Sequence, residues 1–220
     1  MDYLWDKFNI KTFPAHTIVF VDGVFQANLS AAKLDDLLAP TPDGLPYHII
    51  EVGDVVSQNI ILGENVIVFN TIRAEIKNPA FLQKKVENTG KNSKFIGDYV
   101  FKNYAALDLS VVGRNMEKNT AISIKTRVFA GTGSVTKLSG AAEILSGAEN
   151  AESDISFAAL CDVDIKSIEF APLQKINSVP KSAEHSAAIW RPAALQIQYL
   201  EQSGIDSTSA NQILADSFLA

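Results

Sequence analysis

Cysteine is almost absent from this sequence of 220 residues, in which Cys161 stands alone. A single cysteine excludes an internal disulfide and any zinc site that is built from several cysteines. A lone thiol is typical of a reducing compartment, so we expect a cytoplasmic protein.

Basic residues are also scarce: 19 Lys and Arg stand against 25 Asp and Glu, for a net charge of −6. A protein that coats nucleic acid or an anionic membrane needs a basic face, so we expect neither partner. Long apolar runs are missing too, since none approaches the ~18–20 residues that span a bilayer. The segment Met1–Lys7 carries acidic residues where a secretion signal has a basic start.

The motifs of common enzymes are missing as well. Gly131–Gly133 lacks the Gly-Lys-Ser/Thr of a phosphate-binding loop, and no Gly-x-Ser-x-Gly nucleophile elbow occurs. His16 and His48 stand without the spacing of metal ligands. Asp162 and Asp164 share one face of a predicted strand, which leaves a carbohydrate-active β-helix enzyme as an alternative. Our main expectation is a protein without catalytic activity.

Residues 1–46 are predicted to form an N-terminal docking segment. Its first fourteen residues mix aromatic and polar side chains at roughly helical spacing. Thr17–Gln26 contains two β-prone runs around Asp22-Gly23, the strongest short-range signal for a hairpin. Ser30–Leu38 predicts a short helix that Pro40 stops.

Residues 47–190 have the sequence pattern of an all-β core. Hydrophobic residues make up 47% of the chain, which is enough for a sizeable core. Many short β-prone runs without intervening helices predict a sandwich, a barrel or a solenoid, and periodicity does not choose among these. We find no repeat of fixed period, so a solenoid would be irregular in sequence. The predicted runs are His48–Val52, Val55–Leu62, Val66–Ile76, Phe95–Val112, Ala121–Ala130, Val135–Ile144 and Ile155–Phe170.

Alternation and its breaks predict details within this core. In Ala121–Phe129 the apolar side chains occupy alternate positions and face one side, as in a half-buried strand. The alternation of Ile155–Ile165 slips at Ser167, which predicts a bend, a bulge or a coil corner. The polar stretch Lys84–Lys94 is predicted to be a loop.

Residues 191–220 predict a C-terminal segment of two short helices. Pro192 is placed at a first helical position, and Gly204 follows the first helix as a C′ residue. A second helix is predicted to begin after Asp206 or Ser207 and to end near Leu219. Neither helix is long enough to be stable alone, so both must pack on the β core or on a partner. The apolar side chains available for this are Leu195, Tyr199, Ile213 and Phe218.

The run from Ala183 to Leu219 resembles the C-terminal signature of the SufB/SufD proteins, the scaffold subunits of SUF iron–sulfur cluster assembly. The matching features are the Ala-Glu-His-Ser motif at Ala183–Ser186, the Tyr-Leu pair at Tyr199–Leu200, Gly-Ile-Asp at Gly204–Asp206, and a final helix that ends in Phe-Leu. Val19–Phe25 is similar to the entry of SufD-type chains into their core. Cys161-Asp162 falls near the place where SufB-type chains carry a Cys-Asp pair.

This resemblance implies a fold and a function. The fold would be mainly β, a right-handed parallel β-helix (β-solenoid) followed by the C-terminal two-helix segment. The function would be that of a scaffold or partner-docking subunit in iron–sulfur cluster assembly, with a SufC-like ABC-type ATPase and a second SufB/SufD-like subunit, or a second copy in a homodimer, as partners. The terminal helices would dock the ATPase.

The resemblance also implies candidate ligands for an iron–sulfur cluster, namely Cys161, His185 and Glu184. Thiolates suit iron–sulfur chemistry, but the alternation places Cys161 among apolar residues, as expected of a buried structural thiol. His185 lies in an apolar phase too, where a hydrogen-bonded core histidine is the other interpretation. One cysteine and one histidine are two of about four ligands, so a cluster would be held transiently at a subunit interface. The alternative function is a stand-alone interaction module that has lost cluster chemistry.

Overall fold

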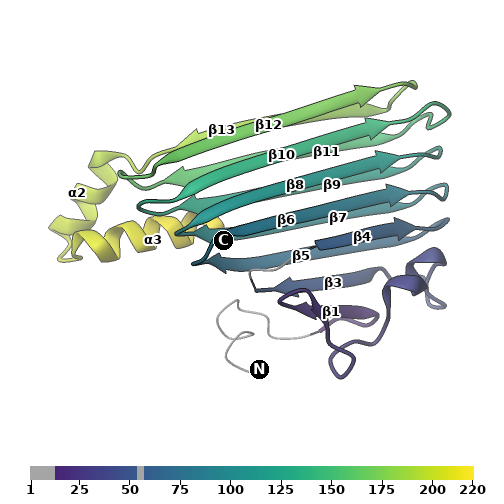
Figure 1. Cartoon of the computed structure of the whole chain (residues 1–220), viewed down its shortest axis with the longest axis horizontal. Helices are drawn as coiled ribbons and strands as arrows, with labels where there is room; N and C mark the ends of the chain where they lie inside the picture. Colours follow the sequence, from purple (N-terminus) through teal and green to yellow (C-terminus); the bar gives the residue numbers. More distant parts are fainter. Residues whose placement is uncertain (1–12, 54–56) are drawn as a thin grey trace.

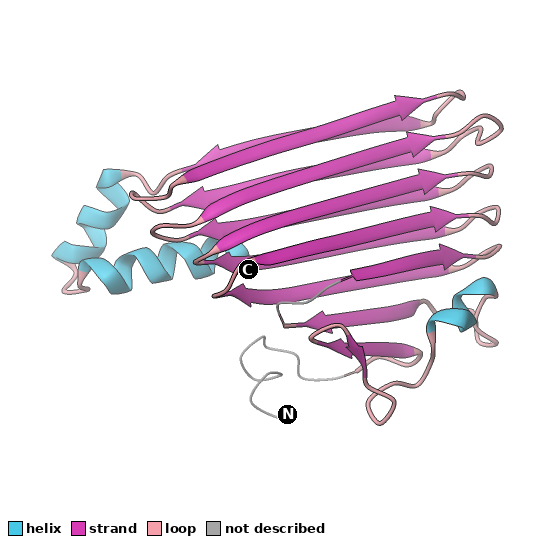
Figure 2. Ribbon diagram, in the orientation of Figure 1, coloured by secondary structure: helices cyan, strands magenta, loops and turns pink. Residues whose placement is uncertain are grey.

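The computed structural model describes residues 13–53 and 57–220, and most of this backbone belongs to two stacked β-sheets (Figure 1). From Tyr47 onward, the chain passes from one sheet to the other at each corner, and the strands of the two sheets run in opposite directions (Figure 2). The result is a β-solenoid of about six turns with two C-terminal helices. This confirms the predicted β-helix and excludes the sandwich and the barrel.

Strands within each sheet are parallel neighbours, apart from the antiparallel hairpin of the first two. The eight-stranded sheet contains, in chain order, β1 (Thr17–Val21), β2 (Val24–Phe25), β3 (Tyr47–Val52), β5 (Ile67–Ile76), β7 (Lys94–Asn103), β9 (Ala121–Ala130), β11 (Glu152–Cys161) and β13 (Ser182–Trp190). The five-stranded sheet contains β4 (Ser57–Leu62), β6 (Ala80–Asn88), β8 (Ala106–Asn115), β10 (Val135–Ile144) and β12 (Ser167–Ile176). The coil rises in the right-handed sense, as nearly all crossovers between parallel strands do (Figure 1).

A partial repeat underlies the stacking. Asn65, Asn92 and Asn119 occupy the same corner of successive turns, 27 residues apart, and their amides are joined at 3.0 and 3.2 Å. All three have φ near +60°, a region that asparagine tolerates better than most residues. In the next turn the offset grows, because Ala121 pairs with Glu152. The 27-residue offset thus holds through β5, β7 and β9 and changes on either side, since Tyr47 of β3 pairs with Val68 of β5. The asparagine spacing is a signal that the sequence analysis missed.

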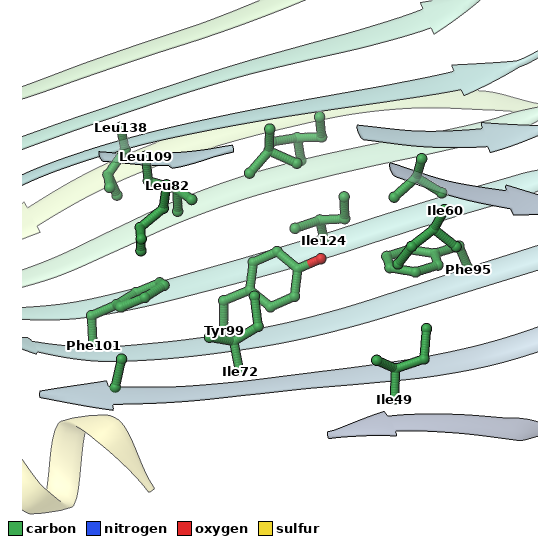
Figure 3. Close-up of a cluster of buried hydrophobic side chains, with 14 of the residues drawn as sticks. Ile49, Ile60, Ile72, Leu82, Phe95, Tyr99, Phe101, Leu109, Ile124 and Leu138 are labelled. Atoms are coloured by element: carbon green, nitrogen blue, oxygen red, sulfur yellow. The ribbon is translucent and has the colours of Figure 1, made fainter. Parts of the chain in front are cut away.

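Alternating side chains form the core between the two sheets. In β8 every second residue is buried, and the buried ones include Leu107, Leu109 and Val111. Figure 3 shows how aliphatic and aromatic side chains from both sheets meet in the interior, with Tyr99 near the middle. Each fully buried aliphatic or aromatic side chain contributes about 1.5–3 kcal/mol. The period-two pattern of the sequence therefore becomes a continuous apolar interior.

Three predicted runs have wrong boundaries. In the run Ile155–Phe170, β11 ends at Cys161, and Asp162 and Asp164 lie in the turn before β12 rather than on a strand face. Lys84–Lys94 is not a loop throughout, because Lys84–Asn88 completes β6 and Lys94 begins β7. The run Phe95–Val112 is two strands, since the chain turns between β7 and β8. Lys84 and Asn88 occupy the buried face of β6, so polar residues do not by themselves indicate a loop. The corner between β7 and β8, Tyr104-Ala105, contains no Gly or Pro that would mark a turn in the sequence. The phase slip at Ser167 is a coil corner, as predicted, and β12 begins there.

The two ends of the solenoid differ. At the first end, β1 extends the eight-stranded sheet, and the 3₁₀ helix η1 (Leu34–Leu38), where the sequence predicted a short helix, packs beside β4. Leu37 of η1 is fully buried in the core. The hairpin predicted around Asp22-Gly23 is present, and it pairs Phe20 with Phe25. At the last end, β12 and β13 are the outermost strands of their sheets. The predicted element over residues 1–12 lies outside the described residues.

Two helices follow the last strand, α2 (Ala194–Gln202) and α3 (Ser207–Leu219). They lie at one end of the strands, as the cyan ribbons of Figure 2 show. Their bounds match the predicted segment, although α2 begins two residues after Pro192. In the described part of the chain, no helix combines the length and the apolar character needed to cross a membrane.

Candidate functional site

The turn between α2 and α3 is set by local sequence. Gly204 adopts φ +85°, and the N–H groups of Gly204 and Ile205 donate to the carbonyls of Glu201 and Leu200. This is the Schellman pattern that ends a helix at a glycine. The Asp206 carboxylate then accepts from the Ser209 N–H at 3.0 Å and caps α3. The chain therefore reverses within a few residues and brings the two helices together.

Helix α3 is anchored on the outer face of the eight-stranded sheet. Its Ala215 and Leu219 are buried against Val100, Phe129 and Leu160, which are contributed by β7, β9 and β11. The Lys102 ammonium also pairs with the Asp216 carboxylate at 2.6 Å. These contacts hold one side of α3 and leave its other side facing α2.

Helix α2, in contrast, has no buried residue. Leu195 and Tyr199 lie one helical turn apart and are 78% and 70% exposed, and Ile213 of α3 is 45% exposed. Together they line a hollow of about 360 Å³, which we call the α2–α3 groove. Its full lining is Leu195, Gln196, Tyr199, Leu200, Ile213, Leu214 and Ser217. Three of the four predicted docking side chains therefore share one apolar surface.

Phe218, the fourth predicted docking residue, is half-buried and does not line the α2–α3 groove. Its ring meets the Trp190 indole edge to face, with centroids 5.7 Å apart, and it packs against the cluster under α3. Helical spacing alone could not separate Phe218 from the other three. The anchoring side of α3 is chosen by contacts with β-strands that lie far away in sequence.

The last turn of the solenoid is a second exposed surface. Residues of β13 that continue the inward-facing phase of β11 include Ala187 and Ile189, and both are exposed because no further turn covers them. Ile189 is 50% exposed. The outer edges of β12 and β13 also present backbone groups without a strand partner among the described residues. Such an edge is a template for pairing with another chain.

Cys161 ends β11 and is fully buried in the core. Burial raises the pKa of its thiol, and the nearby charge of Arg191 opposes this only in part. A buried thiol with a raised pKa stays protonated at neutral pH, whereas a metal ligand has to be a thiolate. The structural interpretation of Cys161 therefore fits its surroundings better than a ligand role.

His185 and Glu184 lie elsewhere on the last turn. His185 stands opposite Ile155, six residues before Cys161 on β11, so about 20 Å of strand separates the two residues. His185 is exposed, in contrast to the core histidine that its apolar phase suggested, and Glu184 faces the opposite side, also exposed. The structure thus does not bring the three predicted ligands together. Among the described residues, no three His, Cys, Asp or Glu side chains cluster as a metal site would require.

A buried polar cluster is a feature that the sequence analysis missed. Lys84 of β6 and Glu51 of β3 form an ion pair across the interior, and both side chains are almost completely buried. The Asn70 amide donates to Glu51 Oε1 at 2.7 Å, and the Tyr99 hydroxyl donates to Asn70 Oδ1 at 3.0 Å. The carboxylate oxygen Glu51 Oε2 has no hydrogen-bond partner in the part of the chain that the structure describes. Lys84 lies in the stretch predicted to be a loop. Its position between Leu82 and Val86, two residues from each, is the one sequence signal that could have indicated its burial.

Burial of this cluster has consequences for its charges. Burial lowers the pKa of Lys84, and the Glu51 carboxylate opposes that shift. Burial raises the pKa of Tyr99 well above its usual value. None of these side chains reaches the surface, so the cluster joins the two sheets rather than offering a site to a solute.

Sequence comparisons add no family to these observations. No protein-family model matches the chain, and no curated protein is similar to it in sequence.

Proposed function

We propose that this protein is a non-catalytic docking subunit in which a rigid β-solenoid carries two interaction surfaces. The α2–α3 groove is the surface for an ABC-type ATPase of the SufC kind, and the resemblance to the SufB/SufD proteins supports this partner. The single observation that carries the proposal is α2, a helix of nine residues that has no buried residue. Helices of this length are marginal in water unless they pack on something.

The open end of the solenoid is the surface that we assign to a second subunit. The first end is covered by β1 and η1, whereas β12 and β13 leave their outer edges without a strand partner among the described residues, and inward-phase side chains of β13 are exposed. A second SufB/SufD-like chain, or a second copy of this chain, could extend the sheets there by strand pairing. The two surfaces together describe a scaffold that links a β-sheet partner to an ATPase.

A stand-alone interaction module without cluster chemistry is the second candidate, and one observation favours it. Cys161 is buried, which raises the pKa of its thiol, and His185 lies about 20 Å along the strand from it. These residues do not fit a cluster site within one chain. An iron–sulfur cluster at a subunit interface stays a prediction, and it would need donors from the second subunit.

The test for the ATPase surface is complex formation between the purified chain and a SufC-type ATPase, followed by size-exclusion chromatography and calorimetry. We expect a stable complex that Leu195→Ser and Tyr199→Ser each weaken at least about tenfold, because each removes a large exposed apolar anchor. The matched control is Leu173→Ser, since Leu173 is 61% exposed on β12, away from the helices. Unchanged affinity in both groove variants would refute this assignment.

Anaerobic reconstitution with iron and sulfide separates the two candidates. A subunit that holds a cluster with its partners gains iron, sulfide and colour in the complex, and Cys161→Ala or His185→Ala lowers the content. A module without cluster chemistry stays colourless in every combination. Iron content that neither substitution changes would remove both residues as ligands and leave the docking proposal standing.

A further inference from the structure

The chemistry of the α2–α3 groove indicates what kind of segment it binds. We infer that the groove takes an amphipathic helix of a partner protein, with apolar side chains on one face and Lys or Arg on its flanks. This inference rests on the proposed docking function and specifies the partner's surface.

The shape of the groove fits a helix. Leu195 and Tyr199 are four residues apart on α2, and Ile213 and Ser217 are four apart on α3. Each pair therefore lies on one face of its helix, and the groove is an apolar channel between two helical ridges. A third helix fills such a channel with side chains at positions i, i+3 or i+4, and i+7. An extended strand would need a free sheet edge, which this surface does not have.

The negative charge of residues 194–220 favours a partner helix that carries positive charge. Residues 194–220 contain three acidic side chains, Glu201, Asp206 and Asp216, and no Lys, Arg or His. Asp216 is already paired with Lys102 on the solenoid. Glu201 and Asp206 flank the turn between the helices, are exposed, and have no cationic partner among the described residues. Hydrogen bonds from Ser209 lower the pKa of Asp206, so its charge persists at neutral pH.

Other occupants fit this chemistry less well. An amphipathic helix that lies on an anionic membrane carries Lys and Arg on its polar face, whereas these helices carry only acids. A second copy seated on the same groove would bring the same acidic flanks together, and like charges oppose each other. A basic partner helix fits both the apolar channel and the two exposed acids, Glu201 and Asp206, at the turn beside it.

The probe for this inference is a pair of labelled synthetic helical peptides of about 18 residues, identical in their Leu positions and flanked either by Lys or by Glu. Fluorescence anisotropy measures their binding to the full chain. We expect the Lys peptide to bind at least about tenfold more tightly than the Glu peptide, and the difference to shrink between about 0.05 and 0.5 M salt. Equal affinity, or no binding of either peptide, would overturn the inference.

Substitutions in the chain then separate the contribution of the acidic residues to peptide binding from that of the apolar groove. Glu201→Lys and Asp206→Asn should each weaken the Lys peptide several-fold, and Asn retains the helix cap of α3. Tyr199→Ser should abolish binding, while Glu169→Lys, at an exposed acid of β12, should leave it unchanged. If Glu201→Lys and Asp206→Asn bind as the unaltered chain does, the groove does not select basic partners.

Further experiments test other occupants of the groove and distinguish failure of this inference from failure of the proposed function. Binding to vesicles of phosphatidylcholine and phosphatidylserine, or self-association in sedimentation, that Tyr199→Ser removes would assign the groove to a membrane or to a second copy and overturn the inference. If the ATPase complex forms and depends on Tyr199 but not on Glu201, the proposed function stands and this inference fails. If the Lys peptide binds but the ATPase does not, the inference stands and the ATPase assignment fails.

Discussion

Polar side chains inside the solenoid are stabilised by the charged or hydrogen-bonding partners that they meet there. Lys84 is tolerated in the core because Glu51 pairs with it, and Glu51 in turn accepts from Asn70. An isolated buried charge costs far more than a paired one, so the members of such a cluster depend on one another. The cluster joins β3 and β6, which belong to different sheets, in the early turns.

Lys84→Met should destabilise the protein by about 3–5 kcal/mol, because it leaves the Glu51 carboxylate buried without its cation. Adding Glu51→Leu to this variant should restore most of the loss, since the double substitution removes both charges. Urea denaturation of the single and double variants measures the free energy of unfolding. A double variant no more stable than Lys84→Met would contradict this account.

Asp43 is a surface residue whose titration is predicted by its contacts. The His16 ring lies 3.0 Å from its carboxylate, and the Leu45 N–H donates to it, which lowers the pKa of Asp43 to about 2. A carboxyl whose pKa falls on folding stabilises the fold above its ordinary pKa of 3.8 and loses that contribution as the pH drops toward 2. Carbon-detected NMR titration should find this value, and His16→Ala should raise it. An unchanged pKa in that variant would show that His16 does not hold the carboxylate.

At the scale of elements, the two terminal helices differ in what stabilises them. α3 has a capped N-terminus and packs on the sheet through Ala215 and Leu219. α2 has no buried residue. Local stability follows buried contacts, so α2 belongs to the least stable part of the described chain. We therefore expect α2 to become more ordered when a partner fills the α2–α3 groove, whereas α3 is already held by the sheet.

Asp206→Ala should weaken α3 by about 0.5–2 kcal/mol, because it removes the acceptor for the first N–H groups of the helix. Hydrogen exchange followed by mass spectrometry should show faster exchange over residues 207–219 and unchanged exchange in β7 and β9. Ser207→Ala is the matched control, since its side chain caps nothing in the structure. Equal exchange in both variants would mean that packing alone holds α3.

At the scale of the whole molecule, the solenoid has a closed end and an open end. Closure at the start comes from β1 and η1, and within residues 13–53 and 57–220 no equivalent element covers the outer edges of β12 and β13. Repeat proteins need terminal caps, and the exposed apolar side chains of the last turn are the basis for the second-subunit surface that we propose. The helices lie at one end of the strands, apart from the outer edge of the last turn (Figure 1).

Ile189→Lys should therefore weaken pairing with a second subunit, because Ile189 lies in the inward phase of the last strand and a charge there opposes sheet extension. Sedimentation equilibrium should show association of the unaltered chain that the variant weakens at least about tenfold. Ile61→Lys is the control, on the far strand β4, where Ile61 is 38% exposed. A strictly monomeric unaltered chain, without any added subunit, would exclude the homodimer.

The sequence by itself determined the class of the fold and the terminal helices. Strand alternation and helix caps are local properties, so the β-rich core, the hairpin at Asp22-Gly23 and the bounds near Gly204 and Asp206 could be predicted from neighbouring residues. The exposed groove was predicted in part, because Leu195, Tyr199 and Ile213 are apolar side chains on helices too short to be stable without packing.

Only the tertiary structure decided which polar residues lie inside and which apolar residues lie outside. Lys84 is buried because Glu51, 33 positions away, meets it across the core. Phe218 packs against Trp190 and is half-buried, whereas Tyr199 on the neighbouring helix is 70% exposed. The separation of Cys161 from His185 follows from the register of β11 and β13. Burial depends on partners distant in the chain, and register is set by the length of each corner, so neither can be derived from local pattern.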